Sequence, residues 1–320
     1  MTSIKDFTLD LSELKFVGRG LARPESILAE RDGTLWISDS SQGGVTRMDR
    51  DGTQTIIGQM GGESNGLAMD REGNLYIANI HNGVFYKMYR DGRYEVLLSE
   101  IDGQSLGAAN YVFMDSQDRL WLAVSTRVLP WFAAASSPRP DGYIILIDEK
   151  GPRIVADGIW FTNEVRLDAK EEYLYVAETM AGRIIRFPVQ KDGFLGEREV
   201  VGPDGLGHGA FVDGFAFDAE GNIWVTTVMR NGLMIITPDG DAHTVFEDPN
   251  PAALDNGVAK MAAGALTPEE MFACMGATLQ FPASVTFAGP DLKTVYMGSL
   301  GMPHLVSFES PVPGLPMRHW

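Results

Sequence analysis

The sequence predicts an all-β fold, a six-bladed β-propeller whose four-stranded antiparallel blades surround a central channel. Three observations lead to this prediction. Glycine is abundant, with 36 of 320 residues, and it recurs beside Asp and Asn, which is typical of many tight turns. A unit of two apolar strands around an Asp- and Gly-rich turn recurs six times along the chain. The period of roughly 40 to 50 residues, with a second hairpin in most units, is that of a propeller blade.

The repeated units can be followed in order along the chain. Each starts with a polar residue before an apolar strand, and a later strand carries an aromatic residue such as Trp36 or Trp121. The second hairpin turns at dipeptides such as Asp51-Gly52, where Gly accepts the positive φ that tight hairpins require. The six units begin at Glu25, Asn65, Asn110, Asn163, Asp213 and Ser284.

The last unit lacks one strand, and a propeller must close its ring. We expect residues 7–11 or residues 15–17 to supply the missing outer strand to this unit. No linker or low-complexity segment divides the sequence, so residues 1–320 are predicted to form a single propeller domain.

Two long insertions, at about 127–141 and 247–282, interrupt the pattern. Both fall on the face that carries the loops between second and third strands and the links between blades. Thr267-Pro268-Glu269-Glu270 is a helix start signal inside the second insertion. Long loops on one face are typical of lids and binding walls, so we predict that this face holds the site.

Composition narrows the classes of function. The formal net charge of −17 disfavours binding to nucleic acid, whose phosphates would be repelled. The sequence shows no apolar run of membrane-spanning length and no signal-peptide pattern at its start. A single cysteine, Cys274, suits a reducing compartment. We therefore expect a cytoplasmic protein, a monomer or homodimer, that acts on a small molecule.

The residues that open the six units carry a chemical prediction. They should all lie beside the channel on the face that carries the two insertions, and each offers an oxygen ligand. Two carboxylates, Glu25 and Asp213, among several amides suit a hard cation, most simply Ca²⁺, with Mg²⁺ or Mn²⁺ as alternatives. Zn²⁺ would favour His or Cys ligands, which show no paired spacing here.

The ordered set of motifs resembles the SMP-30/gluconolactonase/LRE-like family of six-bladed propellers. The matching pieces are Glu25 opening the first unit, Asn110 before its strand, Thr162-Asn163-Glu164-Val165, Asp213-Gly214 before an apolar strand, and Tyr175-Val176-Ala177-Glu178-Thr179. The resemblance covers the chain apart from the two insertions.

The resemblance implies that Glu25, Asn163 and Asp213 bind a divalent metal, with Asn110 as a further ligand or a substrate contact. It also implies hydrolysis of lactones, and in some relatives of phosphotriesters. The sequence departs from the family pattern at three places. Ser26 follows the first ligand, Glu164 stands where Gly is common, and Ala108 replaces an Arg that is frequent in the sugar-lactone branch.

These residues lead to a hypothesis of metal-assisted hydrolysis, in which Asp213 is the general base for the attacking water or attacks directly. Trp131, Phe132 and Phe281 would form an apolar wall, suited to a substrate less polar than a sugar lactone. His208 is a candidate proton shuttle. The candidates for substrate binding are Asn65, Ser284, Glu164, His81, His304 and Trp131.

Two alternatives stay open at this stage. One is a non-catalytic propeller in which a structural metal ties the blades together and the face binds a ligand. The other is a phosphotriesterase, lyase or isomerase reaction on the same metal. Open coordination positions beneath the insertions would favour an enzyme, whereas a fully closed ligand ring would favour the structural role.

Overall fold

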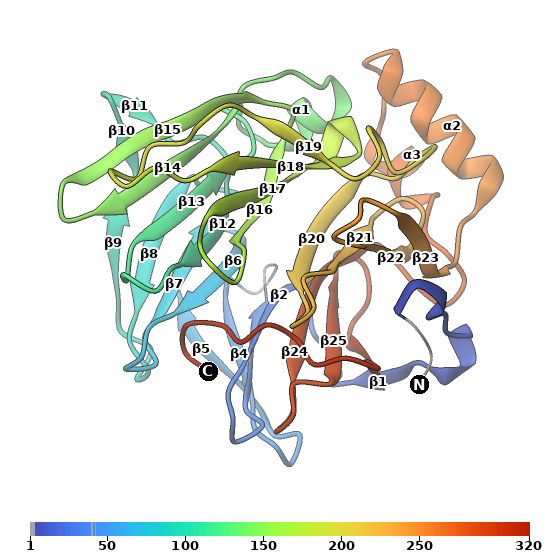
Figure 1. The fold of residues 1–320 in the computed structure, drawn as a ribbon, viewed down its shortest axis with the longest axis horizontal. Coiled ribbons are helices and arrows are strands. Elements are labelled where there is room, and N and C mark those ends of the chain that lie inside the picture. Colours follow the sequence, from blue (N-terminus) through green and yellow to red (C-terminus); the bar gives the residue numbers. More distant parts are fainter. Residues whose placement is uncertain (1–3, 40, 42) are drawn as a thin grey trace.

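The computed structural model describes residues 4–39, 41 and 43–320 and has six four-stranded antiparallel sheets arranged in a ring (Figure 1). The chain is therefore a six-bladed β-propeller, as predicted. The first three blades, from inner to outer strand, are β2 (Pro24–Ala29), β3 (Leu35–Asp39), β4 (Gly44–Met48) and β5 (Gln54–Gln59); β6 (Ser64–Met69), β7 (Leu75–Asn79), β8 (Val84–Met88) and β9 (Tyr94–Leu98); and β12 (Ala109–Met114), β13 (Leu120–Val124), β14 (Gly142–Asp148) and β15 (Gly151–Ile159).

The remaining blades follow the same order. They consist of β16 (Thr162–Leu167), β17 (Tyr173–Glu178), β18 (Arg183–Pro188) and β19 (Glu199–Val201); β20 (Val212–Phe217), β21 (Ile223–Thr227), β22 (Gly232–Ile236) and β23 (Ala242–Glu247); and β24 (Pro282–Ala288), β25 (Thr294–Ser299), β26 (Leu305–Glu309) and β1 (Lys15–Val17). A small hairpin of β10 (Glu100–Ile101) and β11 (Gln104–Ser105) lies between the second and third blades.

The ring closes through the N-terminal strand β1. It pairs antiparallel with β26, with Phe16 opposite Val306, so the prediction for residues 15–17 is confirmed. Residues 7–11 do not form a strand, since Leu11 already begins the 3₁₀ turn η2 (Leu11–Glu13). Phe7 instead packs against Trp224, with ring centroids 5.7 Å apart. The first segment of the chain thus supplies the outermost strand of the last blade and joins the two ends of the ring.

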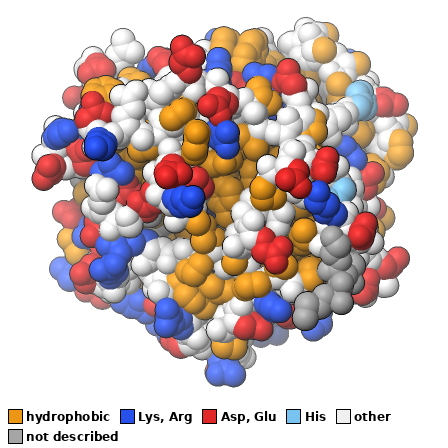
Figure 2. Space-filling model, in the orientation of Figure 1, with side chains coloured by type: hydrophobic (Ala, Val, Ile, Leu, Met, Phe, Trp, Pro, Cys, Tyr) orange, Lys and Arg blue, Asp and Glu red, His pale blue; other side chains and the backbone are white. Residues whose placement is uncertain are grey.

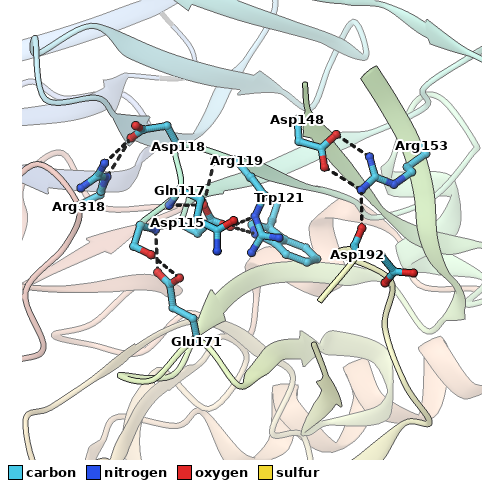
Figure 3. Close-up of polar contacts among 11 residues, drawn as sticks. Asp115, Gln117, Asp118, Arg119, Trp121, Asp148, Arg153, Glu171, Asp192 and Arg318 are labelled. Atoms are coloured by element: carbon cyan, nitrogen blue, oxygen red, sulfur yellow. Dashed lines mark hydrogen bonds and ion pairs between the residues drawn. The ribbon is translucent and has the colours of Figure 1, made fainter. Parts of the chain in front are cut away.

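A carboxylate at the end of the inner strand explains the repeated turn of the sequence. Asp115 accepts hydrogen bonds from two backbone N–H groups of the following turn and from Trp121 Nε1, at 2.9 Å (Figure 3). Asp218 binds its own turn and Trp224 Nε1, at 3.0 Å, in the same way. Both Trp side chains are fully buried, so the carboxylate satisfies an indole N–H that water cannot reach.

We predict that Asp115→Ala lowers the free energy of unfolding by about 3–5 kcal/mol, because it leaves the Arg119 guanidinium and an indole N–H without their buried partner. Arg119 Nε lies 2.6 Å from Asp115 Oδ2 (Figure 3). Asp118 in the same turn is a matched control, since its side chain is 60% exposed in the pair with Arg318, so this pair should contribute at most about 1 kcal/mol. Urea denaturation measures both variants, and equal losses would contradict the role of the buried carboxylate.

The two insertions carry short helices on one side of the ring. The first contains α1 (Phe132–Ser136), and the second contains α2 (Pro251–Ala262) and α3 (Pro268–Phe272) (Figure 1). The predicted helix start is confirmed, because Thr267 and Glu270 form a capping box at the beginning of α3. The longer α2 was not expected from the sequence. Within the described residues, no helix has the length and apolar character needed to span a membrane.

The C-terminal segment covers the opposite end of the channel. Leu315 N donates to Phe217 O at 2.9 Å, and Arg166 Nη1 lies 3.1 Å from Met317 Sδ. In Figure 1 this segment crosses the ring beneath the inner strands, and in the same view Figure 2 shows apolar side chains in the middle and charged ones toward the rim. The C-terminal segment thus lies over this end of the channel, on the opposite side from the insertions.

Candidate functional site

An irregularity at the start of every inner strand brings six polar side chains to one mouth of the channel. In each blade the register to the second strand shifts at this point, for example between Pro24 and Ile27 in β2 and between Val212 and Phe215 in β20. Such a bulge re-aims side chains that a regular strand would direct elsewhere. The side chains are those of Glu25, Asn65, Asn110, Asn163, Asp213 and Ser284, all of them buried.

Four of these side chains line one cavity, and two support them from behind. Glu25, Asn110, Asn163 and Asp213 face the cavity. Asn65 does not line it, and its Nδ2 donates to Glu25 Oε1 at 2.6 Å and to Asn110 O at 3.1 Å.

Ser284 also lies outside the cavity, where its Oγ donates a short hydrogen bond to the Glu25 carbonyl. The inner ring of the prediction is thus brought together, and Asn65 and Ser284 lie where they hold Glu25 in place.

The carboxyl groups of the site are buried close together, and this determines their protonation. Burial raises the pKa of Asp213 well above its ordinary value, and the charges of Glu25 and Glu164 raise it further. Burial also raises the pKa of Glu25, opposed by the nearby Arg23 guanidinium. Glu164 lies beneath the site, where it binds Arg166 at 3.0 Å, and burial raises its pKa to about 7. Without a further cation the site favours bound protons.

The oxygen atoms of the site fit a hard cation. Asn163 Oδ1 and Asp213 Oδ1 are buried, and no group in the described residues donates a hydrogen bond to either oxygen. Asn163 Nδ2 donates to Thr179 Oγ1 at 3.2 Å. This hydrogen bond fixes the amide so that Oδ1 points away from Thr179. In the described part of the chain no three His, Cys, Asp or Glu side chains form a metal-binding group, so a cation here would depend on amide oxygens. That donor set suits Ca²⁺ better than Zn²⁺.

Arg23 is a cavity residue that the sequence reasoning missed. Its Nη2 lies 2.8 Å from Glu25 Oε2, an ion-pair distance, although the alignment is outside that of a hydrogen bond. Its Nη1 donates to Asn65 Oδ1 at 3.0 Å, and the guanidinium lies 5.7 Å from the Trp131 ring. Arg23 has a positive φ of 60°, which an arginine rarely adopts. This backbone geometry turns the side chain inward, and nothing in the local sequence signals it.

Of the other residues predicted to belong to the site, only some line the cavity. Trp131 lines the cavity, and its Nε1 lies 3.4 Å from Glu63 Oε2. His81 and His304 do not line it, and the His304 ring packs against Phe16 at 4.5 Å between centroids. His208 pairs with Asp255 at 2.9 Å on the surface and does not line the cavity.

The upper part of the cavity is a wall of apolar side chains. Phe281 is buried behind this wall, in a cluster with residues of α2 and α3, and does not line it. The sequence did not single out most of the wall, which consists of Ile80, Trp131, Ala135, Phe161, Met180, Phe211, Val228, Met229, Met261, Leu266, Met271 and Leu300.

The fold and the site define a class of protein, a six-bladed propeller with an acidic and amide centre under an apolar lid. A family model described as SMP-30/Gluconolactonase/LRE-like region matches residues 23–254. The chain therefore belongs to this family, as its sequence motifs suggested.

Among curated proteins, 6-deoxy-6-sulfogluconolactonase from Pseudomonas putida is 23% identical over 180 residues. These residues are 54% of this chain and 52% of that enzyme, so the match spans about half of its length.

Solved structures with the same fold include a gluconolactonase from Xanthomonas campestris, with a TM-score of 0.70, 18% identity and coverage of 94% of this chain and 89% of that one. Another is regucalcin, a calcium-binding protein from Agrobacterium tumefaciens, with a TM-score of 0.68, 17% identity and coverage of 94% and 96%. At these identities the likeness establishes the fold alone.

Proposed function

We propose that this protein is a divalent-metal-dependent hydrolase that opens a lactone or an ester. The observation that carries the proposal is the pair of buried acceptor oxygens, Asn163 Oδ1 and Asp213 Oδ1, which face a cavity beside a second carboxylate, Glu25. A buried polar atom without a partner is costly, so it is kept where a ligand completes it. Membership of a family named for gluconolactonase, and the sulfogluconolactonase relative, support a lactone as the substrate.

Glu25, Asn163 and Asp213 would hold the cation, with Asn110 as a fourth protein ligand or a substrate contact. Ca²⁺ is the ion that this donor set suits best, and the regucalcin structure belongs to a protein described as calcium-binding. Mg²⁺, Mn²⁺ and Zn²⁺ are the alternatives. When bound, the cation would polarise the substrate carbonyl and stabilise the oxyanion that forms.

Asp213 would move the proton of the reaction. Its carboxylate lines the cavity, and no described residue donates a hydrogen bond to Oδ1. With one carboxylate oxygen on the cation, Asp213 would accept a proton from the attacking water at its other oxygen. Asn65 and Ser284 would act as positioning residues, because both bind Glu25 and neither reaches the cavity.

A chelator experiment on a substrate panel tests this function. Turnover of lactones, aryl esters and a phosphotriester would be measured on the full chain before chelator treatment, after it, and after Ca²⁺ is restored. We expect at least one lactone or ester to be hydrolysed, a large loss with chelator and recovery with Ca²⁺. A panel without any chelator-sensitive turnover would count against the proposal. If only the phosphotriester were hydrolysed, the protein would be a phosphotriesterase rather than a lactonase or esterase.

A further inference from the structure

Resting on the proposed function, we propose that the cavity recognises its lactone or ester through an alkyl or aryl substituent rather than through hydroxyl groups. The cavity has two chemically different ends. Six polar residues line it, and the four from the inner strands form its floor at the channel mouth. The other twelve lining residues are apolar, so a substrate whose reacting group meets the floor places its remaining part against hydrocarbon and thioether groups.

The two insertions together contribute five of the twelve apolar residues of the wall. The second insertion contributes Met261 of α2, Leu266 of the link between α2 and α3, and Met271 of α3. Trp131 and Ala135 bring side chains from the first insertion. All three residues of the second insertion lie beyond residue 254, where the family match ends. This part of the wall is therefore a feature of the chain outside the matched region.

The two insertions are fastened to each other above the cavity. Ser136 Oγ donates to Leu266 O at 2.7 Å, which joins the end of α1 to the link between α2 and α3. Met180 packs against both of the apolar clusters that the insertions form. The wall is consequently one continuous surface over the polar floor.

The chemistry of this wall decides between two kinds of lactone. A polyol would place hydroxyl groups against the apolar side chains of the wall, which lowers affinity on the order of tenfold or more for each hydroxyl left unpaired. Each buried methylene instead increases binding about fourfold. Four methionines, whose unbranched side chains adapt to irregular shapes, contribute to the wall, and they are Met180, Met229, Met261 and Met271.

A series of γ-lactones from butyrolactone to dodecalactone, with gluconolactone for comparison, tests the proposal on the full chain. We expect kcat/KM to increase about fourfold for each methylene until the wall is filled, and to be lowest for gluconolactone. Met271→Gln keeps the length of the side chain but makes its tip polar, so it should reduce the gain per methylene. Phe272→Gln, at an exposed neighbour outside the cavity, is the matched control and should keep the gain of the parent protein.

Calorimetry with alkyl γ-lactams, which the protein would bind without opening, gives a readout independent of turnover. An alkyl lactam should bind more tightly than pyrrolidinone, with a negative heat-capacity change. If lactones turn over but the series is flat or gluconolactone is preferred, the substrate class is overturned and the hydrolase stands. If no lactone turns over but alkyl lactams bind, the hydrolase fails and the apolar recognition stands. If neither occurs, both are overturned.

Discussion

Replacing Asp213 by Asn should lower kcat/KM by about 10²–10⁴-fold while leaving the fold intact, since an amide cannot accept the proton of the attacking water. The side chain is buried among carboxyl groups that raise its pKa, so its negative charge is unfavourable in the metal-free protein. Removing that charge should not lower the free energy of unfolding without metal. Steady-state kinetics on the best lactone of the panel, with urea denaturation in chelator, measures both quantities.

Asp218→Asn is the matched control for this experiment, because Asp218 follows the same strand at its other end. It accepts bonds from two turn N–H groups and from the buried Trp224, so its loss should cost about 1–3 kcal/mol of stability without reducing turnover of the folded protein. The two variants separate a chemical role from a structural one. Full activity in the Asp213 variant would remove Asp213 from the mechanism, and a covalent intermediate trapped on the parent protein would make it the nucleophile.

Adding Ca²⁺ to chelator-treated protein should raise its melting temperature by about 4 °C at roughly 100 times the Kd, because a ligand that binds only the folded state contributes about 2.7 kcal/mol there. Glu25→Gln and Asp213→Asn should each reduce this shift strongly, since each removes a charged ligand. Asp218→Asn lowers the starting melting temperature but should keep the shift. Differential scanning calorimetry measures all four proteins, and an unchanged shift in both ligand variants would place the cation elsewhere.

The shift should also depend on pH in a defined direction. Without a cation, the pKa values of Asp213, Glu25 and Glu164 in the folded protein lie above those in the unfolded chain, with Glu164 at about 7. The folded protein then binds more protons than the unfolded chain between about pH 4 and pH 7, so its stability falls as pH rises through this range. A cation replaces these protons, and the shift should be larger at about pH 8 than at about pH 5. A pH-independent shift would mean that no carboxylate is a ligand.

The architecture could be predicted from the sequence because a blade is a local, repeated unit. The Asp-Gly turns and the alternation of apolar strands depend on residues close together in the chain, and the structure has the six blades that they indicate. Ring closure by the N-terminal segment followed from counting strands, and the structure selects residues 15–17 over residues 7–11 as the closing strand. The start of α3 was visible because a capping box is four consecutive residues. The polar ring was visible for the same reason, since its members repeat at the head of each unit.

The tertiary structure alone decided which side chains from different blades and insertions meet in the cavity. Arg23 lines the cavity and has a positive φ, which the neighbouring residues in the sequence do not predict. The methionine-rich wall combines side chains from both insertions, from links between blades and from loops between second and third strands. Propeller periodicity specifies which strand follows which, whereas a cavity is determined by the packing of segments far apart in the chain. The sequence by itself therefore determined the ring and its oxygen-bearing mouth, whereas three-dimensional packing determined which side chains line the cavity above that mouth.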